Sequence, residues 1–332
     1  MKRIAIIGGG SWGTALSLVL SKVSQKVSLW VFEPELVEAI RHERRNSLYL
    51  PEFELPPNVD ASHCLEECLS GADIVLTVVP SNHCRSIYQA MTPFITPNMI
   101  FVSATKGIEN ETLMRMSEII EAVVSPIFPP QIAVVSGPSF AREVARGDPT
   151  AVVVASQKTE IAVRVQREFS SRSLRLYTNA DIVGVELGGA VKNVIAIAAG
   201  VCTGLGFGFN SLAALITRGL AEMTRLAIAC GGKRETLAGL AGTGDLVLTC
   251  TGELSRNRHV GVQLGKGEAL ADIVGATRMI AEGILTTRAT ISLAHNHQIE
   301  MPITEQMYQL LYQGKSPRDA IRELMDRPLT RE

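Results

Sequence analysis

One lysine stands alone in an apolar stretch of the chain and has the chemistry for proton transfer. Lys192 lies in a segment that reads as a buried helix, on the same face as Val185, Gly188, Gly189 and Ala196. A lysine buried among small residues loses hydration, which lowers the pKa of its ammonium group. Lys192 is therefore the predicted general acid–base residue, and a lysine that reaches the helix surface is the alternative.

A glycine-rich turn near the N-terminus has the spacing of a dinucleotide site. Gly8, Gly10 and Gly13 fit G-x-G-x-x-G between the apolar run 4–7 and the helical pattern 15–23. The first glycine permits a tight turn, the second lets the backbone approach a pyrophosphate, and the third lets the helix pack on the strand. Because free N–H groups at the helix N-terminus favour the same anion, this context predicts dinucleotide binding.

An acidic residue follows the second predicted strand. Glu33 lies 20 residues after Gly13, where a carboxylate can accept hydrogen bonds from the adenosine ribose and repels a 2′-phosphate. This position favours NAD(H). Arg41, Arg44 and Arg45 follow on the next predicted helix, and one of them could hold a 2′-phosphate, although a solvated helix face explains them more simply. The sequence leaves NAD(H) and NADP(H) both open.

Two further segments follow predicted strands, at the edge where open α/β sheets bind ligands. Lys106 comes after the strand 99–103 and could orient a substrate carbonyl and stabilise negative charge that develops on it. Gly137 and Ser139 come after the strand 131–136 and could contact substrate and nicotinamide through backbone N–H groups and a hydroxyl. Ordinary turn and helix-capping roles are the alternatives for Lys106 and Ser139.

Two polar sets occur in the second half of the chain. Asp245 lies in a glycine-rich turn and could bind a substrate hydroxyl while holding Lys192 in place; a helix N-cap is the alternative. Ser255, Arg256 and Asn257 offer a hydroxyl, a guanidinium and an amide near a predicted helix start. Arginine binds phosphate through two parallel hydrogen bonds, so we expect the substrate phosphate here, with Arg256 also able to reach the cofactor. A polar cap beside a surface arginine is the alternative.

Secondary-structure patterns place these residues in two domains. Short runs that are apolar on both faces alternate with helical patterns, which indicates a parallel sheet covered by helices. Strands are predicted at 4–7, 27–31, 73–79, 99–103, 131–136, 150–155 and 174–177, helices at 15–23, 35–45, 111–124 and 158–169, and a proline-punctuated loop around 51–57.

Only helical patterns occur after about residue 180. They are predicted at 186–199, 212–230, 255–264, 269–274, 282–295 and 304–312. The expected architecture is α/β: a doubly wound Rossmann-type parallel sheet in residues 1–183 and an all-helical substrate-binding domain in residues 184–332. We expect the active site in the cleft between them.

The bulk composition excludes several classes of protein. With 46% hydrophobic residues and a formal net charge of −1, the chain is typical of a globular protein and has no field that favours nucleic acid or a membrane surface. Its six cysteines and six histidines lack metal-site spacing, so we expect free thiols and no metal. The N-terminal apolar run is too short for a signal peptide, so a cytoplasmic location is expected.

Seven ordered motifs carry a resemblance to a known family. They begin at residues 8, 103, 136, 188, 216, 239 and 255 and read GGGSWGTA, SATKGI, SGPSFA, GGAVKNV, ITRGLAEM, GLAGTGD and SRN. From residue 1 to about 282, the chain closely resembles the bacterial NAD(P)-dependent glycerol-3-phosphate dehydrogenase family. The resemblance implies hydride transfer from the nicotinamide C4 to dihydroxyacetone phosphate, which yields sn-glycerol 3-phosphate for phospholipid synthesis. It places the family's catalytic lysine at Lys192.

The same resemblance implies further cofactor contacts. They are expected from Lys106 and Arg256, already introduced, and from Ser11, Trp12, Ala141 and Glu282. Trp12 is also expected to pack beneath the glycine turn.

Three expectations concern the wider molecule. The apolar helical domain favours a homodimer. Arg218, Glu222 and Arg225 share a predicted helix face and suggest an ion-pair network. Two rival functions stay open: a related dehydrogenase of a hydroxy acid such as 3-hydroxyisobutyrate or ketopantoate, and a non-catalytic nucleotide sensor.

Overall fold

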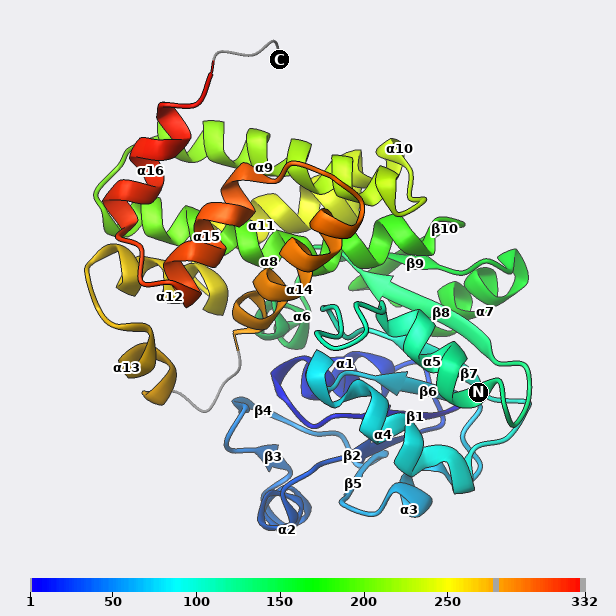
Figure 1. The fold of residues 1–332 in the computed structure, drawn as a ribbon. Coiled ribbons are helices and arrows are strands. Elements are labelled where there is room, and N and C mark those ends of the chain that lie inside the picture. The colour runs from blue at the N-terminus through cyan, green and yellow to red at the C-terminus, as the bar shows by residue number, and fades with distance from the viewer. Residues whose placement is uncertain (1, 277–280, 329–332) are drawn as a thin grey trace.

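The computed structural model describes residues 2–276 and 281–328. Eight strands form one sheet in the order β10-β9-β8-β7-β6-β1-β2-β5, and the helices that follow β10 form a separate body on one side of it (Figure 1). The predicted architecture of a Rossmann-type sheet followed by a helical domain is confirmed. The strands are β1 Arg3–Ile7, β2 Lys26–Trp30, β5 Val59–Ser62, β6 Ile74–Thr77, β7 Ile100–Ser103, β8 Gln131–Ser136, β9 Thr150–Ala155 and β10 Leu174–Asn179.

Both faces of the sheet are buried. Successive side chains of β1 alternate between two cores, with Ile4 and Ile6 in one and Ala5 and Ile7 in the other. This double burial explains the apolar runs of the central strands, such as β6 and β7, whereas β10 at the sheet edge alternates between buried and exposed residues. The first core includes α1 Ser11–Leu20, α2 Pro34–Glu43, α6 Ala141–Arg146 and α7 Thr159–Phe169; the second includes α3 Leu65–Leu69, α4 Cys84–Met91 and α5 Met116–Val124.

One strand pair departs from the predicted parallel sheet. β9 runs antiparallel to β8, with Val134 opposite Ala155 and Ser136 opposite Val153. The connection between these strands contains only the six-residue helix α6, which rises about 9 Å. The chain does not return to the opposite end of β8, and β9 starts at the edge where β8 ends.

The segment around the three prolines is more ordered than the predicted loop. β3 Arg45–Asn46 and β4 Leu50–Glu54 form an antiparallel hairpin, and β5 pairs with β2 at the sheet edge. Pro51 is tolerated because β4 has a partner strand on one side only. The loop prediction was wrong because Pro51 lies inside β4, and only Pro56 and Pro57 lie in the bend between β4 and β5.

Two helices are shorter than predicted. The helix expected at 35–45 ends at Glu43, because Arg44 adopts a left-handed conformation with φ 54°. The helix expected at 111–124 starts at Met116, because Leu113 has φ 60° and the Glu118 side chain caps the backbone N–H of Arg115. The short 3₁₀ turns Ser81–His83 and Thr92–Phe94 flank α4.

The helical body is built around α8 Ile182–Gly204, whose residues from Gly184 to Cys202 are all buried. By length and composition α8 could cross a membrane, but 94% of its apolar window is buried inside the protein, as in a core helix. Around it lie α9 Phe209–Ala229, α10 Arg234–Ala238, the π-type turn Leu240–Gly244, α11 Asp245–Thr251, α12 Arg256–Gly265, α13 Leu270–Gly275, α14 Glu282–Asn296, α15 Pro302–Tyr312 and α16 Pro317–Met325.

Helices α8 and α12 cross at backbone contact. A Cβ on Gly200 would lie 2.1 Å from the carbonyl oxygen of Arg258, and a Cβ on Gly261 would lie 2.0 Å from that of Ile197. Gly204 and Gly265 repeat the contact one turn later. Glycines four residues apart on both helices therefore fix the crossing without side chains between the two backbones.

Candidate active site

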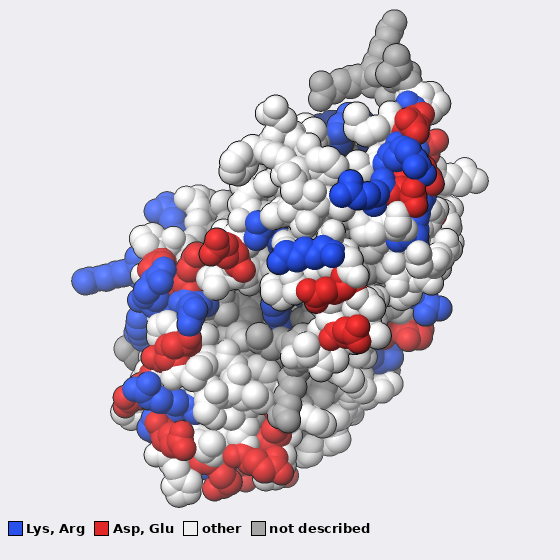
Figure 2. Space-filling model, turned by 90° about the vertical axis from the view of Figure 1, so that its left-hand side faces the viewer, with Lys and Arg blue, Asp and Glu red and all other residues white. Residues whose placement is uncertain are grey.

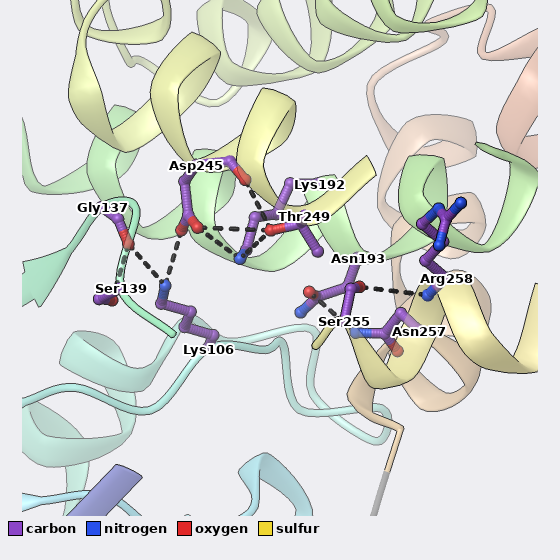
Figure 3. Close-up of polar contacts among 10 residues, drawn as sticks. All are labelled: Lys106, Gly137, Ser139, Lys192, Asn193, Asp245, Thr249, Ser255, Asn257 and Arg258. Atoms are coloured by element: carbon purple, nitrogen blue, oxygen red, sulfur yellow. Dashed lines mark hydrogen bonds and ion pairs between the residues drawn. The ribbon is translucent and has the colours of Figure 1, made fainter. Parts of the chain in front are cut away.

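Three charged side chains from separate elements meet between the sheet and the helical body (Figure 3). The Nζ atom of Lys192 donates to Oδ1 of Asp245 at 2.6 Å, and the Nζ atom of Lys106 donates to Oδ2 of the same carboxylate at 2.6 Å. Lys106 comes from the loop after β7, Lys192 from α8 and Asp245 from the start of α11. One carboxylate thus joins two ammonium groups, which leaves the charged cluster with a net positive charge.

Burial of Lys192 controls its protonation. Only 6% of the residue is exposed, and this burial is the main reason why the pKa of Lys192 falls from 10.5 to about 8. The charge of Lys106 acts in the same direction, while Asp245 opposes both. An amine with that pKa exchanges protons near neutral pH. The direction agrees with the expectation from the apolar helix.

Thr249 belongs to the cluster although the sequence analysis did not single it out. Its hydroxyl accepts a hydrogen bond from Nζ of Lys192 at 2.7 Å and donates to the Asp245 carbonyl oxygen at 2.6 Å. An ammonium group has three N–H bonds, and Asp245 and Thr249 use two of those of Lys192. Within the described residues the third has no partner, so it can serve a substrate. The position four residues after Asp245 on a helix was the available signal.

Lys106 is held in the same manner. Besides Asp245, its ammonium group donates to the carbonyl oxygen of Gly137 at 3.1 Å. Gly137 has φ 145°, and its carbonyl oxygen also accepts from the Ser139 hydroxyl at 2.9 Å. Ser139 does not cap α6, since Phe140 occupies the N-cap position without a side-chain bond. The capping alternative for Ser139 is therefore wrong, and its hydroxyl lies beside Lys106 (Figure 3).

Glycines in α8 let the two halves approach. A Cβ on Gly189 would lie 2.4 Å from the Ser136 hydroxyl oxygen and 3.6 Å from Cγ of Lys106, and a Cβ on Gly188 would lie 2.5 Å from the carbonyl oxygen of Ala241. The end of β8 and the turn before α11 thus pack directly on the helix that carries Lys192. The interdomain contact of the charged cluster depends on this small-residue face.

The three residues expected to bind phosphate have different surroundings. Ser255 caps α12 by accepting from the N–H of Arg258 at 3.2 Å. Asn257 is buried; its amide donates to Asn193 at 3.0 Å and its oxygen accepts from the N–H of Gly283 at 2.9 Å. Arg256 is exposed. Asn257 therefore connects α12 with the start of α14 and with the residue after Lys192, while Arg256 faces solvent.

The glycine turn has the geometry of a pyrophosphate site. A Cβ on Gly13 would lie 1.9 Å from the Gly8 carbonyl oxygen, so the helix packs against the turn as expected, and Gly8 has φ 124°. A Cβ on Gly10 would meet no protein atom within 4 Å, which is the open approach that a pyrophosphate needs. The residues of this turn therefore fit a dinucleotide. Trp12 and Ala141 are partly buried, and both pack against the first core.

Glu282 connects the helical half with the loop after β6. Its carboxylate accepts from the Ser81 hydroxyl at 2.7 Å and from the Ser81 N–H at 3.2 Å. Ser81 follows β6, so Glu282 contacts the edge of the sheet at which open α/β sheets bind ligands. Figure 2 shows a hollow between the two halves, with positive and negative side chains interspersed around it. Among residues 2–276 and 281–328, no group of His, Cys, Asp or Glu could hold a metal ion.

Comparisons with known proteins agree along the whole chain. The family described as NAD-dependent glycerol-3-phosphate dehydrogenase matches with its N-terminal part at residues 3–162 and its C-terminal part at residues 181–322. A glycerol-3-phosphate dehydrogenase (NAD(P)+) from Koribacter versatilis is 59% identical, over 100% of this chain and 99% of that protein. The chain belongs to the NAD-dependent glycerol-3-phosphate dehydrogenase family.

Two further comparisons support this membership. A glycerol-3-phosphate dehydrogenase (NAD(P)+) from Citrifermentans bemidjiense is 54% identical over 100% of this chain and 99% of its own length. The crystal structure of glycerol-3-phosphate dehydrogenase from Coxiella burnetii has 42% identity and a TM-score of 0.94, and the match covers 98% of this chain and 99% of that one.

The ion-pair network expected in this family member is not formed. Glu222 is buried, and its carboxylate accepts from the backbone N–H groups of Ile303 and Thr304 at the start of α15, which makes it a cap for that helix. Arg225 donates to the Glu300 carbonyl oxygen instead. The helical spacing places these three side chains on one face of α9, but the carboxylate of Glu222 binds the N–H groups at the start of α15 instead of the arginines.

Proposed function

We propose that this chain catalyses the reversible reduction of dihydroxyacetone phosphate to sn-glycerol 3-phosphate with NADH or NADPH, for phospholipid synthesis. The observation that carries the proposal is the contact of Lys192 and Lys106 with the two oxygens of Asp245. This arrangement presents one unused N–H of each ammonium group to a ligand. When bound, the nicotinamide supplies hydride to the substrate carbonyl carbon, or accepts it in the reverse direction.

Lys192 is the proton donor in this proposal. During reduction, Lys192 transfers the proton of its third N–H bond, which has no acceptor in the cluster, to the carbonyl oxygen of the substrate. During oxidation, it takes a proton from the substrate hydroxyl. Lys106 stabilises the negative charge that develops on the same oxygen, and Asp245 keeps both ammonium groups in position. The Gly137 and Ser139 segment contacts the substrate beside Lys106.

The substrate phosphate is assigned to the start of α12. The guanidinium of Arg256 is exposed and can form two parallel hydrogen bonds with phosphate. Ser255 and Asn257 belong to the same site, although their side chains also hold α12 in place. The cofactor is assigned to the turn Gly8–Gly13 with Ser11 and Trp12, and to Glu33, Lys106, Ala141, Arg256 and Glu282.

We further propose how the molecule is organised. The cofactor domain comprises residues 1–183 and the substrate domain residues 184–332; α8 begins at Ile182, close to this division. The enzyme acts in the cytoplasm as a homodimer, which sedimentation of the purified protein would test.

Oxidation of NADH and NADPH, followed at 340 nm with dihydroxyacetone phosphate, tests the activity. Wild type should turn over, and Lys192→Ala should lose at least about 1,000-fold in kcat. Lys22→Ala removes an exposed lysine and should behave as wild type. Absence of turnover by a wild-type protein that still binds a coenzyme would contradict the proposal and favour a hydroxy-acid dehydrogenase or a nucleotide sensor.

A further inference from the structure

The β3–β4 hairpin is fixed to the glycine turn by its first residues. Asn46 is fully buried, and its amide donates to the Gly9 carbonyl oxygen at 2.7 Å and to the Thr14 hydroxyl at 2.9 Å. Its side-chain oxygen accepts from the N–H of Tyr49 at 3.1 Å. A buried amide with all these bonds satisfied holds its surroundings in one arrangement. The hairpin thus has a defined position over the turn.

Tyr49 continues this connection towards the end of β2. Its carbonyl oxygen accepts from the Ser11 hydroxyl at 2.8 Å, and its phenol donates to Oε1 of Glu33 at 2.8 Å. Glu33 occupies the N-cap position of α2 but forms no side-chain cap there. Its carboxylate is instead held by Tyr49, with the second oxygen available to a ligand.

The arginines that could bind a 2′-phosphate are engaged elsewhere. Arg44 donates to three backbone carbonyl oxygens, those of Leu55, Pro56 and Val59. Moving Arg44 to a 2′-phosphate would break all three of these hydrogen bonds.

The other two arginines are exposed and already paired. Arg41 donates to the Ala61 carbonyl oxygen at 3.1 Å and pairs with Glu38, and Arg45 pairs with Glu54. The segment 33–54 contains six glutamates against three arginines. Its charge therefore disfavours an additional phosphate dianion beside Glu33.

We propose that Tyr49 is a positioning residue that holds Glu33 for the adenosine ribose hydroxyls and that this chain therefore prefers NADH to NADPH. The inference rests on the proposed function, because it concerns the coenzyme of that reaction. A fixed carboxylate accepts hydrogen bonds from a free ribose hydroxyl, whereas a 2′-phosphate would meet like charge. Tyr49 adds to this choice by preventing the carboxylate from rotating away.

The test is a fluorescence titration of the protein with NADH and with NADPH in the absence of substrate. Wild type should bind NADH at least about tenfold more tightly. Glu33→Gln should reduce this preference by about tenfold, mainly through tighter NADPH binding, because the like charge is removed. Tyr49→Phe should reduce the preference by about threefold to tenfold, mainly through weaker NADH binding.

The double variant of Tyr49→Phe and Glu33→Gln tests whether Tyr49 acts by positioning Glu33 or by supporting the surrounding structure. If Tyr49 acts through Glu33, Tyr49→Phe should have little further effect in the Glu33→Gln background. Glu35→Gln removes an equal charge from the first turn of α2, and Tyr177→Phe removes an exposed phenol on β10; both should leave the preference unchanged. Three results would overturn the inference: equal or tighter binding of NADPH by wild type, an equal effect of Tyr49→Phe on both coenzymes, or the same effect with and without Glu33.

The titration also distinguishes this inference from the proposed function. Tighter binding of NADH without any reduction of dihydroxyacetone phosphate would contradict the proposed function but not the coenzyme inference. Reduction of dihydroxyacetone phosphate by a protein that binds NADPH more tightly than NADH would contradict the coenzyme inference but not the proposed function.

Discussion

Two sites in this molecule use a carboxylate to hold its neighbours, but they differ in burial. Asp245 is 1% exposed and binds two ammonium groups that come from the sheet half and the helical half of the chain. Glu33 is partly exposed and binds one neutral phenol from the adjacent hairpin. Charges act more strongly on one another where water is excluded. The buried site is therefore suited to stabilising a transition state, and the partly exposed site to a moderate preference between two coenzymes.

The largest effect that would separate these sites is expected at Asp245. Asp245→Asn leaves the buried ammonium group of Lys192 and the partly buried one of Lys106 without their counter-ion, so kcat should fall by about 100-fold to 1,000-fold and the free energy of unfolding by about 3–5 kcal/mol. Steady-state kinetics and thermal unfolding measure these changes. Asp272→Asn alters an exposed carboxylate and is the matched control; similar losses in both variants would remove the difference between buried and exposed sites.

The pH dependence of the reaction should report the buried amine. Because burial brings the pKa of Lys192 to about 8, reduction should slow about tenfold per pH unit above that value, as the amine loses the proton that it must donate. Oxidation should show the opposite trend and rise towards pH 8. Profiles of kcat/KM in both directions between pH 6 and 10 measure this, and parallel profiles in the two directions would exclude Lys192 as the proton carrier.

A smaller effect is expected at the exposed Arg256. Arg256→Lys keeps the charge but loses the planar pair of donors, so KM for dihydroxyacetone phosphate should rise about tenfold, the equivalent of one charged hydrogen bond. The value of kcat should change little. An unchanged KM would mean that the phosphate binds elsewhere. A large loss of kcat would mean that Arg256 takes part in catalysis, a role that we assign to the cluster around Asp245.

The smallest effect on turnover is expected at the crossing of α8 and α12. Gly261→Ala forces the helices apart and should lower the free energy of unfolding by about 1–3 kcal/mol, with a modest rise in KM because α12 carries the proposed phosphate site. Gly275→Ala, where a Cβ meets no atom within 4 Å, should be nearly neutral. Chemical denaturation of both variants measures the difference, and equal stability would mean that the backbones can separate without cost.

The sequence was sufficient for features encoded by neighbouring residues. The turn Gly8–Gly13 lies where its spacing predicts, and Lys192 is buried as its apolar helix predicts. The Glu33 position after β2 was also found from its distance to the glycines. Each of these signals lies within one strand–turn–helix unit or one helix.

Features that depend on distant partners were missed. Tyr49 lies between the predicted helix 35–45 and the predicted loop around 51–57, and β4 overlaps that loop. The contact of Asn46 with the glycine turn positions the β3–β4 hairpin. Thr249 gains its role from Lys192, which is 57 residues away. The antiparallel direction of β9 depends on its pairing with β8. The crossing of α8 and α12 depends on four glycines in these two helices. Their four-residue spacing could have been noticed, but not which helices they join.

The glycine crossing also sets a distance. Lys192 lies on α8 and Arg256 on α12, so main-chain contact between these helices determines how far the proton donor lies from the proposed phosphate anchor. We therefore expect the site to select substrates by the length of the carbon chain between their carbonyl and their phosphate.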